Sequence, residues 1–357
     1  MTRAAVLFRV DAGPQQGWEH LMRCLIVAAA LQRRRRPAHF LSQLQPASLV
    51  PLVKRGGNEW LPAAHPVGGP EDLLQTQAQI RQLNAQAVVV DSPLVNQSYL
   101  EQLRATGAAV VVLDSLATSA LPTHLVVNPL LGPSRDDYDY GNGTQLLLGA
   151  RYALVRPEVR RIRPIRAQEP PQPFRLLIAL GDDDLNNQSG ELAKILLNCP
   201  RVGHVDILVR PFHPQLESLT ALAASCPERL AVYSEPHEVP LRLSRCHLAL
   251  TAGNAWSLEL ACVGIPQLLI VQTESYWPTA HRLEEEGAAT CLGWHANVSA
   301  STIRQALAAL LSDPFERQSM ARAGRKLIDG RGSDRFVTAL ELILQPLERQ
   351  RQRACAA

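Results

Sequence analysis

Short runs of apolar residues alternate along the chain with longer stretches in which apolar side chains recur every third or fourth position. The short runs are typical of strands buried on both faces, and the periodic stretches are typical of amphipathic helices. In the first half the predicted strands are residues 4–8, 38–42, 59–62, 87–90, 108–113 and 124–128, and the predicted helices are residues 24–36, 50–55, 70–84 and 99–105. Strands separated by helices in this way predict a parallel sheet that is covered on both faces.

A second set of the same elements follows an interruption. Residues 156–173 contain five Pro and five Arg and show almost no apolar periodicity, so we predict a linker there. Beyond it the predicted strands are residues 174–180, 205–209, 230–233, 248–251 and 267–271, and the predicted helices are residues 189–197, 216–224, 257–263, 280–286 and 301–311. The last helical pattern, residues 334–345, could cross back to the first half.

The pattern predicts an α/β fold with two Rossmann-like parallel-sheet domains and a cleft between them. We expect an N-terminal domain over residues 1–155, the linker over 156–173, a C-terminal domain over 174–333 and a terminal helix over 334–357. The first strand-to-helix turn lacks Gly-x-Gly-x-x-Gly, which argues against a dinucleotide-dependent dehydrogenase.

Composition narrows the class of protein. With 46% hydrophobic and 19% charged residues the chain resembles an ordinary globular protein, and a net charge of +3 is too small to indicate a nucleic-acid partner. The seven cysteines are scattered and never spaced as Cys-x-x-Cys, which favours free thiols in a reducing cytoplasm over disulfides or a zinc site. The chain has no signal-peptide pattern and no apolar run near the ~20 residues of a membrane span, so we expect a cytoplasmic protein.

Candidate chemistry gathers in residues 8–24, which connect the first predicted strand to the first predicted helix. Gly13, Pro14 and Gly17 supply the bends of this loop. In open α/β sheets, ligands bind in such loops, outside the carboxyl ends of the strands. The polar residues that the loop carries are Arg9, Asp11, His20 and Arg23.

Several motifs along the chain match one family in the same order. In the first half they are Phe8-Arg9-Val10-Asp11-Ala12, Met22-Arg23-Cys24-Leu25, Val88-Val89-Val90-Asp91, Val111-Val112-Leu113-Asp114-Ser115-Leu116, Val126-Val127-Asn128-Pro129 and residues 149–158. In the second half they are Leu180-Gly181, Thr251-Ala252-Gly253, Glu259, Gly264-Ile265-Pro266 and Glu286-Gly287-Ala288-Ala289. Together they resemble the UDP-sugar hydrolase family of pseudaminic acid biosynthesis and the related spore-coat polysaccharide proteins.

The resemblance implies the two-domain GT-B architecture of nucleotide-sugar glycosyltransferases. It implies hydrolysis of UDP-2,4-diacetamido-2,4,6-trideoxy-β-L-altropyranose to the free sugar and UDP, with no cofactor and no metal. It also implies enzymes of a surface-glycan pathway as partners.

By the same resemblance, His20 is the base that activates water to attack the anomeric carbon while UDP leaves. The start of a helix disfavours the imidazolium and so keeps a neutral base available, whereas the neighbouring Glu19 favours the charged form. A histidine that merely caps the helix or lies on the surface is the alternative.

Other residues of the first domain are candidates for substrate binding. Arg9, Asp11, Gly17 and Arg23 belong to the same loop, where Asp11 and Arg23 contact sugar substituents or form a structural ion pair. Asp91 and Asp114 end predicted strands, where each binds sugar hydroxyls or amides, or else caps a helix.

In the second domain, Ala252-Gly253 follows a strand and opens a helix, so its backbone N–H groups are candidates for holding the diphosphate. Glu259 matches the family acid that binds the ribose hydroxyls, with an exposed helical glutamate as the alternative. The further substrate-binding candidates of this domain are Gly181, Asn254 and Tyr276.

The chain departs from the family in its loops. The family's Gly-x-Gly-His, double glycine, Gly-Gly-Ser-Thr and Asn-Gln correspond here to Gly17-Trp18-Glu19-His20, Gly181-Asp182, Gly253-Asn254-Ala255-Trp256 and Ser275-Tyr276. Residues 182–184 are three aspartates at a helix start, which cap the helix or hold a bridging metal. Three functions therefore stay open: a UDP-sugar hydrolase, a GT-B glycosyltransferase that uses a UDP-sugar, and a degenerate relative that binds a sugar nucleotide without catalysis.

Overall fold

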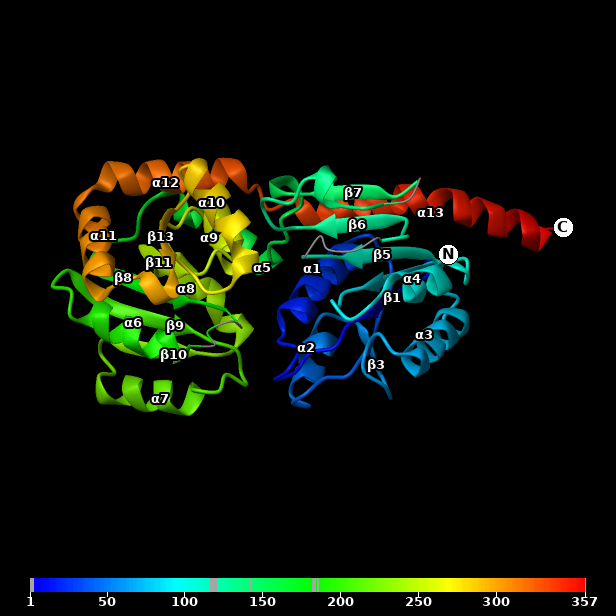
Figure 1. Ribbon diagram of the computed structural model, residues 1–357, viewed down its shortest axis with the longest axis horizontal. Coiled ribbons are helices and arrows are strands. Elements are labelled where there is room, and N and C mark those ends of the chain that lie inside the picture. Colours follow the sequence, from blue (N-terminus) through cyan, green and yellow to red (C-terminus); the bar gives the residue numbers. More distant parts are fainter. Residues whose placement is uncertain (1–2, 116–120, 141–142, 182–183, 185, 357) are drawn as a thin grey trace. The chain divides into compact units, whose positions relative to one another are not determined.

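The computed structural model describes residues 3–115, 121–140, 143–181, 184 and 186–356, with the backbone alone for residues 347–356. The chain divides into two compact units. Unit 1 contains Met1–Pro129, Pro133–Leu154 and Arg331–Ala357, and unit 2 contains Leu130–Gly132 and Val155–Gly330. In Figure 1 the strands of unit 1 are blue to green, with its last helix in red, and unit 2 is green to orange.

Unit 1 is built on a seven-stranded parallel sheet in the order β3-β2-β1-β4-β5-β6-β7. Its strands are β1 (Val6–Arg9), β2 (Ala38–Ser42), β3 (Glu59–Pro62), β4 (Ala87–Val90), β5 (Ala109–Leu113), β6 (Leu125–Asn128) and β7 (Gln145–Leu148). Its helices are α1 (Glu19–Arg33), α2 (Leu49–Arg55), α3 (Pro70–Gln82), α4 (Gln97–Arg104) and α13 (Gly332–Ala356), with short 3₁₀ turns η1 (Arg135–Asp137) and η2 (Ala150–Tyr152).

Unit 2 repeats this plan with a six-stranded parallel sheet in the order β10-β9-β8-β11-β12-β13. Its strands are β8 (Phe174–Ala179), β9 (Val202–Leu208), β10 (Leu230–Tyr233), β11 (Leu248–Thr251), β12 (Gln267–Val271) and β13 (Thr290–Trp294). Its helices are α5 (Pro157–Arg161), α6 (Gln188–Leu197), α7 (Leu216–Ser225), α8 (Val239–Arg245), α9 (Ala255–Val263), α10 (Trp277–Glu285), α11 (Ala300–Ser312) and α12 (Pro314–Leu327), with 3₁₀ turns η3 (Ile165–Ala167), η4 (Pro236–Glu238), η5 (Glu274–Tyr276) and η6 (His295–Asn297).

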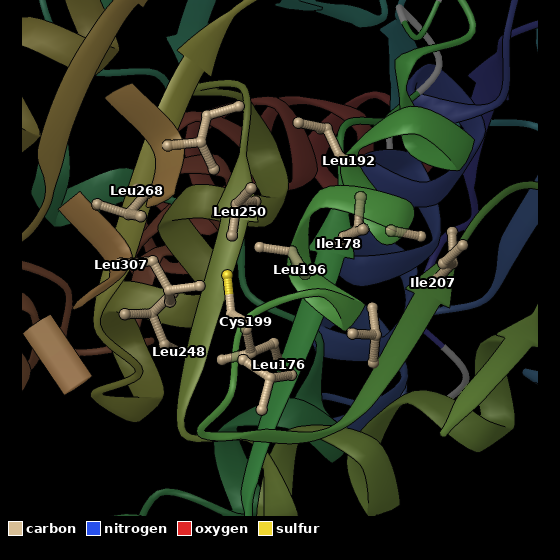
Figure 2. Close-up of a cluster of buried hydrophobic side chains, with 14 of the residues drawn as sticks. Leu176, Ile178, Leu192, Leu196, Cys199, Ile207, Leu248, Leu250, Leu268 and Leu307 are labelled. Carbon is tan, nitrogen blue, oxygen red and sulfur yellow. The ribbon is translucent and has the colours of Figure 1, made fainter. Parts of the chain in front are cut away.

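Each sheet is held by apolar side chains on its faces. In unit 1 alternate valines of β4 and β5 are buried on one face and pack with residues of α3 and α4, among them Leu100 and Leu103; they are Val88, Val90, Val110 and Val112. In unit 2, Figure 2 shows Leu176, Ile178 and Leu250 of the strands beside Leu192 and Leu196 of α6. Burial of leucine and valine side chains contributes roughly 1.5–3 kcal/mol each, so these clusters fix which face every helix covers.

The strand order places a topological switch point in each unit. In unit 1 the chain reverses direction across the sheet between β1 and β4, and in unit 2 it does so between β8 and β11. At such a point the loops that follow two neighbouring strands run to opposite sides of the sheet and leave a crevice at the carboxyl ends of those strands. Ligands of open α/β sheets bind in this crevice. The loops at these two points are therefore the first places to look for a functional site.

The two-sheet α/β prediction is confirmed, and the differences lie at edges and linkers. The strands β7 and β13 were not predicted, because both are partly exposed edge strands with weak apolar patterns. Helix α1 begins at Glu19, earlier than expected, since buried Trp18 and Leu21 anchor its first turn. Helices α8 and α12 were also missed; α12 is rich in charged residues.

Residues 156–173 do not form a free linker. They lie in unit 2, where α5 packs against α8 and α9 and the side chains of Val159 and Ile162 are buried. The basic residues of this segment also contact the unit, since Arg163 donates to the carbonyls of Arg325 and Ile328 at 2.7 Å. The last helix, α13, packs against α1 in unit 1, where Arg33 pairs with Asp334 at 2.7 Å.

Candidate functional site

At the switch point of unit 1, a histidine from the first turn of α1 meets the aspartate that follows β4. His20 Nδ1 lies 2.6 Å from Asp91 Oδ1, although the two residues are 71 positions apart. Arg23, one turn after His20, donates to both carboxylate oxygens: Nε is 2.6 Å from Oδ2 and Nη2 is 2.6 Å from Oδ1. We refer to these three residues as the His20–Asp91–Arg23 cluster.

The contacts of His20 indicate where its proton lies. His20 Nδ1 lies 2.6 Å from Asp91 Oδ1, which only accepts hydrogen bonds, and 2.9 Å from Arg23 Nη2, which only donates them. We assign the proton to Nδ1 on the shorter contact, so that it donates to Asp91. Nε2 then carries the lone pair and can take a proton from a bound group. The His20 side chain is 24% exposed, whereas that of Asp91 is fully buried. The cluster is therefore a reachable imidazole held by a buried carboxylate.

Asp91 remains ionised in this setting. Burial alone raises the pKa of its carboxyl, but the charges of Arg23 and His20 and their hydrogen bonds hold that pKa below its ordinary value. Burial, together with the charge of Asp91, raises the pKa of the neighbouring Cys24 thiol, whose Sγ lies 3.6 Å from Asp91 Oδ2. Cys24 is therefore a protonated thiol and not a nucleophile.

Arg9 and Asp11, two other candidates, form a second buried cluster below the loop. Arg9 Nε lies 2.5 Å from Asp72 Oδ1, and its guanidinium also donates to Asp11. The carboxylate of Asp11 accepts the backbone N–H groups of Gln43 and Val67, each at 2.8 Å. These contacts connect the loop after β1 to the rest of unit 1, and a substrate-binding role for the two residues stays a prediction.

Gly17 shapes the approach of the chain to α1. It has a φ of 72°, and its carbonyl accepts a hydrogen bond from the Gly13 N–H at 3.0 Å. A left-handed backbone is adopted most readily by glycine. The bend at Gly17 thus precedes the helix turn that carries His20.

Asp114, which follows β5, belongs to a different hydrogen-bond network. Its Oδ2 accepts from Tyr138 Oη at 2.6 Å, and Tyr138 Oη in turn accepts from Asn128 Nδ2 at 2.9 Å. Burial and the nearby Asp114 raise the pKa of the Tyr138 hydroxyl. From the sequence we expected Asp114 to contact the sugar or to cap a helix, and the hydrogen bond from Tyr138 was not foreseen.

At the switch point of unit 2, the loop after β11 is closely packed. Gly253 has a φ of 82°, and a Cβ there would lie 2.9 Å from Ala280 Cβ. Asn254 is fully buried and caps α9, accepting from Trp256 N at 3.1 Å and donating to the Leu180 carbonyl at 3.0 Å. The loop therefore joins the ends of β8 and β11 in one fixed arrangement.

The amide that we expected to meet a diphosphate has a partner within the protein. Gly253 N donates to Ser257 Oγ at 3.0 Å, and Ser257 Oγ lies 2.8 Å from Thr251 Oγ1. Ala252, the other residue assigned to the diphosphate, is fully buried. A phosphate role for the Gly253 N–H requires Ser257 to turn away, and that role stays a prediction.

Glu259 is buried rather than exposed, and it pairs with Arg156. Both residues belong to unit 2, and Arg156 donates through its backbone N at 2.8 Å, through Nε at 2.9 Å and through Nη2 at 2.5 Å. Burial lowers the pKa of Arg156, but the charge of Glu259 outweighs it, so the pKa is raised. The Arg156 guanidinium also lies over the Trp256 ring, 4.4 Å from its centroid. Glu259 can accept ribose hydroxyls only if part of this pairing is exchanged.

The remaining candidates of unit 2 lie at the same edge of the sheet. Gly181 follows β8 with a φ of 85°, and Tyr276 is buried at the end of η5. Asp184 caps α6 by accepting from Gln188 N at 2.6 Å and Ser189 N at 3.2 Å. Asp182 and Asp183 lie outside the described residues, so the bridging metal stays a hypothesis.

A group of amides at the carboxyl edge of unit 2 was missed by the sequence analysis. Gln272, which follows β12, donates to Gln188 Oε1 at 3.0 Å, and Gln188 Nε2 lies 3.3 Å from His295 Nδ1. Within the described part of the chain, the buried Gln272 Oε1 has no hydrogen-bond partner. A buried acceptor is costly to leave without a hydrogen bond, so Gln272 is a candidate for a ligand contact. Only the position of Gln272 directly after a predicted strand could have indicated it.

The chain is 23% identical over 338 residues to the spore coat polysaccharide biosynthesis protein SpsG of Bacillus subtilis (strain 168), and the match covers 93% of this chain and 96% of SpsG. No protein-family model matches the chain.

Three solved structures resemble the chain over at least 94% of its length. MurG of Acinetobacter baumannii has a TM-score of 0.63 at 17% identity, covering 95% of this chain and 99% of MurG. The chain has the GT-B fold. Spinosyn rhamnosyltransferase SpnG, complexed with thymidine diphosphate, has a TM-score of 0.63 at 19% identity, covering 94% of this chain and 100% of SpnG. UDP-GlcNAc 2-epimerase of Neisseria meningitidis, bound to UDP-GlcNAc, has a TM-score of 0.63 at 12% identity, covering 94% of this chain and 99% of the epimerase.

The described residues contain neither a membrane-spanning helix nor a cluster of metal ligands. None of the helices in that part of the chain is both long and apolar enough to span a membrane. The same residues contain no group of three or more His, Cys, Asp or Glu side chains arranged to hold a metal ion.

Proposed function

We propose that the chain is an enzyme of polysaccharide biosynthesis that hydrolyses a UDP-linked diacetamido-trideoxyhexose to the free sugar and UDP. The observation that carries the proposal is the His20–Asp91–Arg23 cluster, a partly exposed imidazole whose Nδ1 lies 2.6 Å from a buried carboxylate. Similarity to SpsG supports the pathway, and the nucleotide-bound relatives support the class of substrate.

In this proposal His20 Nε2 removes a proton from water as the water oxygen attacks the anomeric carbon. The bond between the anomeric carbon and the diphosphate oxygen breaks, and UDP leaves with that electron pair. The proton on Nε2 then passes to solvent or to UDP. Asp91 stabilises the imidazolium during the step, and Arg23 keeps Asp91 ionised and oriented.

Unit 2 is the proposed nucleotide-binding unit. Its support is the buried Gln272 Oε1, an acceptor for the uracil N–H, and the Gly181 and Gly253 loops at the switch point. Glu259 is proposed to bind the ribose after exchanging part of its pairing with Arg156. Asn254 is proposed to position the loop and not to contact the ligand, because its side-chain Oδ1 and Nδ2 both form hydrogen bonds within the protein.

The test is UDP release from the UDP-sugar by purified His20→Ala. Loss of a positioned general base lowers kcat by about 100- to 10,000-fold, so release should fall by that factor while the far-UV circular dichroism stays unchanged. The matched control is His237→Ala, because the His237 side chain is 68% exposed and lies in unit 2. Unchanged release in His20→Ala would refute the assignment of the base.

Glycosyl transfer is the second candidate function, and the similarity to the rhamnosyltransferase SpnG favours it. His20 would then activate an acceptor hydroxyl in place of water. Release of UDP only when an acceptor is added would establish transfer. Calorimetry that detects no affinity for UDP or a UDP-sugar would instead favour a non-catalytic relative, a reading supported by the engaged Gly253 N–H and Glu259 side chain.

A further inference from the structure

Unit 2 contains a cavity at the edge of its sheet opposite the switch point. Its volume is about 500 Å³, and its lining includes Arg166, Glu169, Gly264 and Pro266. Gly264 and Pro266 lie directly before β12, and residues 166–169 lie shortly before β8. Because all pairings in this sheet are parallel, these residues lie at the amino ends of the strands. The cavity is therefore separate from the loops at the carboxyl ends that are assigned to the nucleotide.

Four of the thirteen residues that line this cavity are arginines. They are Arg166, Arg317, Arg322 and Arg325, and the acidic residue in the lining is Glu169. Arg317 is neutralised by Glu169, with Nε 2.5 Å from Oε1 and Nη2 2.9 Å from Oε2. The other three arginines leave an excess of positive charge around the cavity.

Arg166 is the most unusual of these side chains. It is 5% exposed, yet its Nε and Nη1 have no hydrogen-bond partner among the residues that the structure describes. Burial, together with the charge of Arg325, lowers the pKa of this guanidinium. A buried guanidinium with unpaired N–H groups is costly to fold, which favours an anionic ligand that supplies the missing acceptors.

Arg325 stands on another wall of the cavity and has the same character. Its Nη2 donates to the Arg163 carbonyl, but its buried Nε lacks a partner within the described ranges. A Cβ on Gly264 would lie 2.9 Å from Arg325 Cδ, so glycine at this position lets the arginine cross the end of α9. Burial and the charge of Arg163 lower its pKa. Two arginines that line one cavity thus each contain buried N–H donors without a partner in the described part of the chain.

We infer that this cavity binds a phosphate group, held by Arg166 and Arg325. Guanidinium donors match the oxygens of a phosphate in number and geometry, and charge-assisted hydrogen bonds of this kind are about twice as strong as neutral ones. Phe315 is 78% exposed and lines the same cavity, and Ile165, next to Arg166, is 65% exposed. These apolar side chains suit a phosphate that is joined to an apolar or aromatic group, which is either a soluble phosphate ester or a lipid headgroup.

The experiment measures binding of inorganic phosphate and pyrophosphate by calorimetry to the wild-type chain, Arg166→Gln, Arg325→Gln and the control Arg304→Gln. Arg304 is an exposed residue of α11 and is not part of the cavity lining. Loss of one charge-assisted contact should weaken binding at least about tenfold in the first two variants and leave the control unchanged. Arg325→Gln keeps the test valid if Arg166→Gln fails to fold.

A second arm distinguishes the source of the phosphate. The same four proteins are sedimented with vesicles of phosphatidylglycerol and with vesicles of phosphatidylcholine. If the protein pellets with phosphatidylglycerol vesicles but not with phosphatidylcholine vesicles, and if this requires Arg166 and Arg325, the ligand is a lipid headgroup. If the protein binds only the soluble anions, the ligand is a soluble phosphate ester. The inference is overturned if neither probe binds the wild type, or if the wild type and both cavity variants bind equally. Since the UDP-release assay does not use this cavity, either proposal can fail alone.

Discussion

Replacing Asp91 by Asn isolates the electrostatic part of the proposed mechanism. Asparagine keeps the size of the side chain but removes the charge that faces His20 Nδ1 at 2.6 Å. At that distance, with an effective dielectric constant of about 20, the attraction between a carboxylate and an imidazolium is roughly 6 kcal/mol. Removal of water from the buried groups offsets part of it, so about 3–5 kcal/mol of stabilisation should be lost in the transition state.

That loss corresponds to a fall in kcat of about 100- to several thousand-fold. KM should change little, because Asp91 is buried and makes its contacts with protein groups. The assay is steady-state UDP release, with the free energy of unfolding measured in urea on the same samples. Asp91→Asn also leaves Arg23 without its counter-charge, which should lower the free energy of unfolding by about 3 kcal/mol.

The matched control is Asp72→Asn. Asp72 is also fully buried in unit 1, and it pairs with Arg9 at 2.5 Å, so its loss should cost a similar amount of stability. Its kcat should nevertheless remain within a few-fold of the wild type under conditions in which it is folded. Equal kcat losses in the two variants would refute the reasoning, because they would show that Asp91 acts through stability alone.

Two further predictions concern the fold of unit 2. Gly253→Ala should lower the free energy of unfolding by about 1–2 kcal/mol because of its positive φ, and by about 1–3 kcal/mol more because the new Cβ overlaps Ala280. The control Gly107→Ala has a similar φ and no atom within 4 Å of the new Cβ, so it should show only the first loss. Equal losses in urea denaturation would contradict this prediction. The second prediction rests on His247, whose Nδ1 accepts the Arg175 N–H at 3.0 Å and whose pKa is lowered by burial. The folded state favours neutral His247, so the contribution of His247 to stability is fully present above the unfolded pKa of about 6.5. That contribution is lost as the pH falls from there through the lower pKa of the folded state, by at most about 1.4 kcal/mol per pH unit. His247→Asn should flatten the dependence of urea stability on pH between about pH 7 and pH 5; an unchanged slope would show that other groups cause it.

The apolar pattern of this sequence predicts the fold well, because a strand buried on both faces must be a continuous apolar run. That requirement revealed β4, β5, β8 and β12 directly. It could not reveal β13, whose residues are all half-buried at the edge of the sheet. It also misjudged residues 156–173, where a few buried side chains attach a segment that is otherwise rich in arginine and proline.

The hydrogen-bond partners of the candidate residues could not be predicted from the sequence. Asp91 lies 71 positions from His20, and Arg156 lies 103 positions from Glu259, so only the folded sheets bring each pair together. The loop residues themselves were found from their place after strands. Whether a polar side chain at such a place faces a ligand or a protein group depends on packing, as Gly253 and Glu259 illustrate by pairing within the protein.

The most direct test of the central claim is the fate of the water oxygen. The UDP-sugar is turned over in water labelled with the heavy isotope of oxygen, and the released UDP is analysed by mass spectrometry. Attack of water at the anomeric carbon leaves the diphosphate oxygens untouched, so the account predicts UDP without label. Label in the terminal phosphate of UDP, or no release of UDP in the absence of an acceptor, would contradict it.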